Sequence, residues 1–134
     1  MLLIVGTDAP LLEGLAQLLA GPRDRIEVVN TLVEAEEVAR QQRPLLIVIE
    51  RACLAADDGA RAFALPLAPG GAFVMYRSGA DDSPPPALAH GAARHVLADL
   101  MLPLERARLF ALAQYVRARA RESGRGWSSA PLSP

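Results

Sequence analysis

The chain has 134 residues, of which 51% are hydrophobic and 22% charged, and its formal net charge at pH 7 is -1. This length suits one domain, and this composition excludes a disordered chain. The near-neutral charge provides no overall field that would attract nucleic acid or an acidic membrane surface, so neither is expected as a partner.

The basic residues of the chain are all arginine, 14 in number. A chain without lysine cannot form a Schiff base or supply the lysine of a P-loop. Cys53 is the single cysteine, so neither an internal disulfide nor a cysteine-based metal cluster can form. This cysteine usage fits a reducing compartment, and we expect a cytoplasmic protein. No apolar run approaches the length that a membrane span needs.

The first part of the chain alternates strand and helix patterns. Thr31 and Glu34 form a capping box that opens the second helix, and the two longest apolar runs do not alternate with polar residues. Such runs are typical of strands that are buried on both faces of a parallel sheet. The predicted elements are a strand at 2–5, a helix at 10–20, a strand at 26–29, a helix at 32–42 and a strand at 45–49.

The second part continues the alternation with shorter elements. The patterns predict a short helix at 60–67, a strand at 72–76, a short helix from the proline run at 84–86 through Leu88 and His90 to Gly91, a strand at 95–98 and a helix at 103–121. The last residues, 122–134, are rich in Ser, Gly and Pro and predict a disordered tail. A domain at 1–121 with this rhythm predicts an α/β fold built on a five-stranded parallel doubly wound sheet.

Three segments resemble the response-regulator receiver family. LLIVGTDAPLLEGLAQLL is similar to the family's opening strand, acidic loop and first helix. RPLLIVIE is similar to the strand that ends at the phosphoryl-accepting aspartate, and HGAARHVLADL to the Gly-Ala turn, fifth strand and Lys-Pro step. The resemblance covers about residues 2–121 and implies the flavodoxin-like (βα)5 receiver fold.

The resemblance also implies where receiver chemistry is missing, because that chemistry needs an acceptor aspartate, acidic ligands for Mg²⁺, a hydroxyl and a lysine. Glu50 stands at the acceptor position. The acidic-loop positions hold Gly6 and Thr7, so that only the adjoining Asp8 is acidic. The remaining positions are the hydroxyl position at Arg77, or at Ser78 after a slip of one residue, the lysine position at Ala98 and the aromatic switch position at His95.

Two interpretations of Glu50 remain open on the sequence. Its longer side chain can mimic a phosphorylated aspartate, with Arg77 as a charge-assisted partner. Alternatively, Glu50 and Arg77 are solvated charges at strand ends. Asp8 is a candidate cap of the first helix, and two carboxylates are too few for a firm Mg²⁺ site, so no metal and no cofactor are expected.

We expect a degenerate receiver-like domain without enzymatic activity, acting in signal transduction through a protein partner or as a homodimer. The expected surface is the family's face of fourth helix, fifth strand and fifth helix, extended by Leu100, Met101 and Leu102. One alternative is a phosphorylation-competent receiver of a two-component phosphorelay with an unusual acceptor, at Asp8, Asp57 or Asp58. A further alternative is a small doubly wound nucleotide-binding protein.

Overall fold

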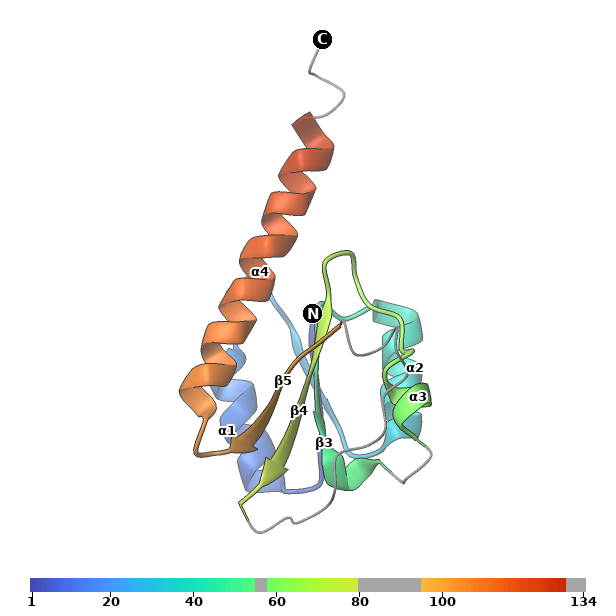
Figure 1. Cartoon of the computed structure of the whole chain (residues 1–134), viewed down its shortest axis with the longest axis vertical. Coiled ribbons are helices and arrows are strands. Elements are labelled where there is room, and N and C mark those ends of the chain that lie inside the picture. Colours follow the sequence, from blue (N-terminus) through green and yellow to red (C-terminus); the bar gives the residue numbers. More distant parts are fainter. Residues whose placement is uncertain (55–57, 80–94, 130–134) are drawn as a thin grey trace.

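The fold is known from a computed structural model that describes residues 1–54, 58–79 and 95–129, with side chains up to residue 122. A parallel sheet of five strands, in the order β2-β1-β3-β4-β5, forms its centre (Figure 1). The strands are β1 (Leu2–Val5), β2 (Ile26–Val29), β3 (Leu46–Glu50), β4 (Ala72–Ser78) and β5 (Val96–Leu102). The helices are α1 (Ala9–Leu19), α2 (Leu32–Gln42), the 3-10 turn η1 (Arg51–Cys53), α3 (Gly59–Ala62) and α4 (Arg106–Ser129).

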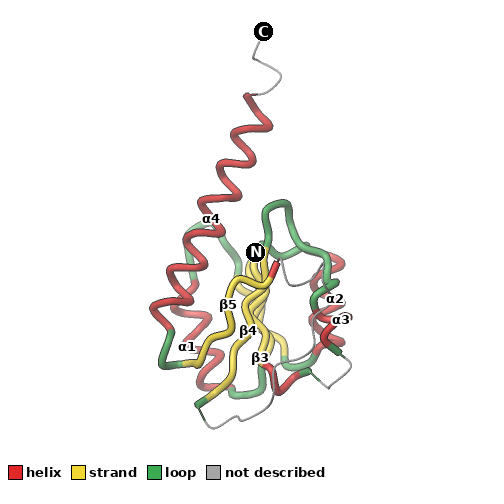
Figure 2. Tube along the Cα trace, in the orientation of Figure 1, coloured by secondary structure: helices red, strands yellow, loops and turns green. Residues whose placement is uncertain are grey.

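Helices cover both faces of the sheet, as Figure 2 shows. Successive strand residues point to opposite faces, so each strand contributes to two cores. Ile4, Val48 and Val74 pack with α1 and α4 on one face. Ile47 and Met75 pack with α2 and the segment that follows α3 on the other. The predicted doubly wound parallel sheet is therefore confirmed.

Local sequence signals explain where the first two helices begin. The Oδ1 atom of Asp8 accepts a hydrogen bond from the backbone N–H of Leu11 at 3.3 Å, which caps α1. The hydroxyl of Thr31 accepts from the backbone N–H of Glu34 at 3.2 Å and caps α2. Both predicted caps are confirmed, and each satisfies a backbone donor that the helix itself leaves unpaired.

The second half departs from prediction in length. β5 was expected at 95–98 but runs to Leu102, because it pairs with β4 as far as Ser78. The short helix expected at 60–67 ends at Ala62, where Phe63 turns inward to pack edge-on against Phe73 at 5.2 Å between ring centroids. The short helix expected at 84–91 lies outside the described residues.

The predicted tail needs a correction. Helix α4 continues through residues 122–129, so this part of the tail is helical, while 130–134 lie outside the described residues. Interior glycine costs a helix about 1 kcal/mol relative to alanine, and serine less, so a helix that is already held by the sheet can continue through them. The helix extends beyond the sheet toward the C-terminus (Figure 1).

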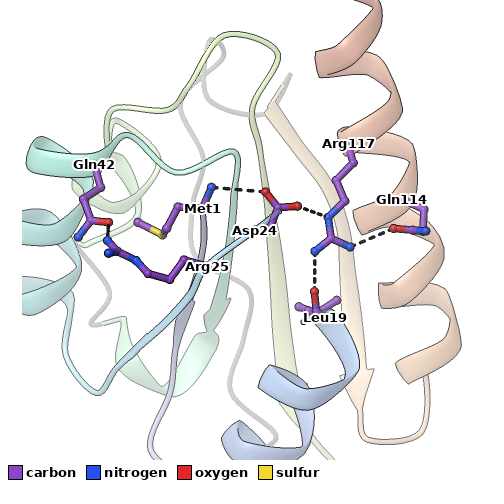
Figure 3. Close-up of polar contacts among 7 residues, drawn as sticks. All are labelled: Met1, Leu19, Asp24, Arg25, Gln42, Gln114 and Arg117. Carbon is purple, nitrogen blue, oxygen red and sulfur yellow. Dashed lines mark hydrogen bonds and ion pairs between the residues drawn. The ribbon is translucent and has the colours of Figure 1, made fainter. Parts of the chain in front are cut away.

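An arginine on α4 fastens this helix to the first βα unit (Figure 3). Arg117 donates from Nε to Asp24 at 2.6 Å and from Nη2 to the backbone carbonyl of Leu19 at 2.5 Å. Its Nη1 donates to Gln114 at 3.0 Å, and Asp24 also lies 3.7 Å from the amino group of Met1. The guanidinium therefore connects the end of α1, the loop before β2 and α4.

None of the helices in the described part of the chain combines the length and the apolar character that crossing a bilayer requires.

Candidate functional site

The candidate site lies at the carboxyl edge of the sheet, where parallel α/β folds place their chemistry. Strand register puts Glu50 beside Tyr76, and Tyr76 beside Leu100. Gly6 follows Val5, which pairs with Ile49, so Gly6 lies next to Glu50. This row crosses β1, β3, β4 and β5 on one face of the sheet.

Glu50 is buried at this edge, with 5% of its surface exposed. Its Oε1 accepts a hydrogen bond from the hydroxyl of Thr7 at 2.8 Å and lies 3.9 Å from the Cys53 thiol. A solvated strand-end carboxylate is therefore excluded. The sequence-predicted positions Glu50 and Thr7 are brought together, in contact across two strands.

Arg77 does not complete the predicted pair. Within residues 1–54, 58–79 and 95–129 no ion pair joins it to Glu50, and its charge instead contributes to lowering the pKa of Glu105. The main causes of that lower pKa are the backbone N–H of Met101 and the Arg108 side chain, both of which donate to Glu105. Successive β4 residues alternate in direction, and Tyr76 takes the place beside Glu50.

Tyr76 fills the space at the acidic-loop position. Its side chain is 0% exposed, and a Cβ added to Gly6 would overlap the Tyr76 hydroxyl oxygen. That hydroxyl has no hydrogen-bond partner in the described structure. Burial, followed by the charge of Glu50, raises the pKa of Tyr76, so the phenol stays neutral. Glycine at position 6 is thus required by the close approach of an aromatic ring from β4.

Cys53 borders the same cluster. Burial raises the pKa of its thiol to about 11, and the charge and hydrogen bond of Glu50 act in the same direction. A thiol with this pKa is almost entirely protonated at neutral pH and is a poor nucleophile. The cysteine therefore belongs to the packing around Glu50.

The residues at this edge do not fit the Mg²⁺ that the receiver fold implies. Gly6 has no side chain, Thr7 is engaged with Glu50, and Asp8 caps α1. In the described ranges no group of three or more His, Cys, Asp and Glu side chains is arranged to hold a metal ion. The space of the missing acidic side chain is taken by the Tyr76 ring.

The extended β5 corrects two predicted positions. Ala98 pairs with Val74 in the middle of the sheet, so it cannot be the residue that faces the acceptor. His95 precedes β5 and lies at the opposite, amino edge of the sheet from Glu50. The β5 residues at the carboxyl edge are instead Leu100 and Leu102, and Pro103 follows the strand.

An ion pair that the sequence did not reveal joins the residue after β3 to the middle of β5. Nε of Arg51 donates to Oδ1 of Asp99 at 3.1 Å, and its Nη2 pairs with Oδ2, so that two N–H groups meet one carboxylate. Arg51 directly follows the acceptor position in η1. The predicted β5 ended at Ala98 and so placed Asp99 beyond the strand, and only the correct strand length brings these two residues together.

The predicted partner surface is wrong for two of its three residues. Leu100 and Leu102 are 0% exposed, because their side chains point into the core under α4, whereas Met101 on the opposite face is partly exposed. The exposed apolar side chains of this region lie on or just before α4, at Leu104, Phe110 and Tyr115, with 78%, 42% and 55% of their surface exposed.

The alternative acceptors are placed as follows. Asp8 is committed to the helix cap. Asp58 lies at the start of α3 and 4.0 Å from Arg61, on the far side of η1 from Glu50 in the chain. Asp57 is outside the described residues. Ser78, the alternative hydroxyl position, ends β4 next to Leu102.

Comparison with known proteins supports the fold class that the sheet order defines. No protein-family model and no curated protein matches the chain. A solved response regulator receiver domain protein (CheY-like) from Methanospirillum hungatei JF-1 is similar, with a TM-score of 0.62 and 17% identity, covering 90% of this chain and 96% of that chain. The lysine decarboxylase LdcF of Francisella novicida is similar with a TM-score of 0.50 and 14% identity, over 84% of this chain and 16% of that chain. The chain has the CheY-like receiver fold.

Proposed function

We propose that this chain is a cytoplasmic receiver-like domain that works in signal transduction without phosphoryl transfer, by binding a protein. The observation that carries the proposal is the closed acceptor site. Glu50 accepts the Thr7 hydroxyl at 2.8 Å, and Tyr76 fills the position of an acidic ligand.

Electrostatics make phosphoryl transfer unfavourable at this edge. An incoming phosphoryl group needs a cation that neutralises its oxygens and an acceptor that is open to attack. The chain has no lysine, and its β5 ends in Leu102 at the place where the fold brings the cation. The side chain of Glu50 is instead buried at the position where a phosphorylated aspartate would lie.

Incubation with Mg²⁺ and acetyl phosphate tests the chemical part of the proposal. Intact-mass spectrometry is expected to show no gain of a phosphoryl group by the natural chain. The matched variant Glu50→Asp restores the acceptor chemistry but neither the metal ligands nor the cation, so it is expected to remain unmodified as well. A stable phosphoryl adduct on the natural chain would refute the proposal, and one on Glu50→Asp alone would show that the metal and cation sites persist.

The binding part of the proposal rests on α4. Tyr115 lies on α4 and Leu104 lies in the turn just before this helix. Both side chains are exposed, and β5, the strand that precedes them in the chain, is an edge strand of the sheet. Exposed apolar side chains that follow an edge strand are a suitable surface for a second copy of the chain.

Sedimentation equilibrium tests this surface. The natural chain is expected to form dimers that Tyr115→Arg dissociates. Val33→Arg is the matched control, because Val33 is equally apolar and 65% exposed but lies on α2. A monomeric natural chain, or dimers that respond equally to both substitutions, would contradict self-association through α4.

A further inference from the structure

A pocket of about 920 Å³ lies between α1 and the connection from β5 to α4. Apolar side chains dominate its walls, with Leu11, Leu15 and Leu18 on α1 facing Leu102 and Pro103. Asp8, Gln17, Ser78 and Arg106 are its polar members. Pockets of roughly 300 to 1,000 Å³ with apolar walls and a few polar groups are typical of sites for small molecules.

A glycine inside α1 keeps this pocket open. Gly14 lies in the middle of the helix, where glycine is less favourable than alanine, and it lines the pocket. A Cβ at this position would meet no atom within 4 Å, so no close contact requires glycine here. The missing side chain instead leaves space between α1 and α4. This contrasts with Gly6, where packing does require glycine.

The charges at the pocket favour an anionic group. Arg106 is exposed at the first turn of α4, and its guanidinium forms no ion pair or hydrogen bond within the described part of the chain. The N-terminus of a helix adds positive potential at the same place. The negative charge of Asp8 is partly offset, because its carboxylate accepts the Leu11 N–H and lies at the N-terminus of α1.

We propose that this pocket binds a small amphipathic anion, with its apolar body between α1 and Pro103 and its anionic group at Arg106. The Ser78 hydroxyl at the end of β4 supplies a further donor. Binding joins α1 to the start of α4, so occupancy is linked to the position of α4 and of the turn before it, which carries Leu104. This inference does not depend on the absence of phosphoryl transfer.

Displacement of the fluorescent probe anilinonaphthalene sulfonate by dodecanoate tests the proposal on the full chain. Dodecanol is the matched neutral ligand, because it has the same tail without the charge. The natural chain is expected to bind dodecanoate more tightly than dodecanol. Failure of dodecanoate to displace the probe, or equal affinities for the two ligands, would overturn the proposal.

Substitutions in the pocket separate its apolar and charged parts. Gly14→Leu fills the space and is expected to abolish binding of both ligands, whereas Gly14→Ala weakens it less. Both variants place a better helix former in α1, so their melting temperatures are expected to be at least as high as that of the natural chain. Unaltered binding by Gly14→Leu would overturn the proposal.

Charge substitutions test the anionic end. Arg106→Gln is expected to weaken the binding of dodecanoate roughly fivefold, the upper limit for an exposed ion pair. The binding of dodecanol is expected to stay unchanged. Asp8→Asn retains a good helix cap and is expected to strengthen dodecanoate binding. Arg121→Gln, an exposed arginine elsewhere on α4, is the control and leaves both affinities unchanged. Equal effects of Arg106→Gln and Arg121→Gln would overturn the assigned position of the anion.

Discussion

Replacing Gly6 with alanine is expected to lower the free energy of unfolding by about 2 to 3 kcal/mol, in the upper part of the range usual for overpacking a core. The added methyl group would overlap the Tyr76 hydroxyl and approach Cδ2 of Leu12 to 2.9 Å. Tyr76 is fully buried between β3 and β5, so its ring has no free space into which to retreat. Urea denaturation measures the loss.

A second substitution distinguishes the overlap with the Tyr76 hydroxyl from a general effect of alanine at position 6. Tyr76→Phe removes the overlapping oxygen and also a buried hydroxyl without a partner, so alone it is expected to stabilise the fold by about 1 kcal/mol. In the Tyr76→Phe background, Gly6→Ala is expected to lower the free energy of unfolding much less. The loss that remains is due to the close approach to Leu12. A double-mutant cycle without coupling would show that the hydroxyl is not what excludes a side chain from position 6.

Replacing Arg117 with methionine is expected to cost about 2 kcal/mol, because hydrogen bonds to charged groups are worth about 1.5 to 3 kcal/mol. Methionine retains much of the apolar stem but leaves the carbonyl of Leu19 and the carboxylate of Asp24 without this donor (Figure 3). The Arg117 side chain is 13% exposed, so water replaces the lost bonds only in part.

A matched arginine on the same helix controls for helix propensity. Arg121 is exposed, and Arg121→Met is expected to change the free energy of unfolding by less than about 0.5 kcal/mol. Equal losses for Arg117→Met and Arg121→Met in urea denaturation would contradict the role of Arg117 in fastening α4 to the first βα unit.

The sequence predicted the sheet well because its central strands are buried on both faces. Continuous apolar runs predicted β1 and β3 to within one residue, and the helix caps at Asp8 and Thr31 predicted the starts of α1 and α2. These signals are local. They depend on backbone hydrogen bonding and on the burial of a few consecutive side chains, which a short segment of sequence expresses directly.

The second half was harder because its boundaries depend on tertiary contacts. Leu100 and Leu102 were assigned to a surface, since Asp99 interrupts the apolar run and a resemblance placed the strand end at Ala98. The polar side chain of Asp99 is accommodated on an edge strand by Arg51, from a segment far away in the sequence. Such a pairing has no signature in either segment alone.

At the candidate site, the sequence indicated which groups are absent but not what replaces them. The lack of lysine and the glycine at position 6 were visible without a structure. That Tyr76 reaches over Gly6, and that Thr7 donates to Glu50, follow from the register between β1, β3 and β4. The prediction that Arg77 pairs with Glu50 was wrong because Tyr76, one residue earlier, lies beside Glu50. Neighbouring residues of a strand point to opposite faces of the sheet.

Amide NMR spectra recorded during titration with Mg²⁺ and then beryllofluoride, a mimic of the phosphoryl group, test the closed acceptor site most directly. The expected result is that the amides of Gly6, Thr7, Asp8 and Glu50 show no saturable shift at millimolar Mg²⁺ and no further change on adding beryllofluoride. Saturable shifts at these four amides, followed by a second set with beryllofluoride, would show an open metal and phosphoryl site and would contradict the account.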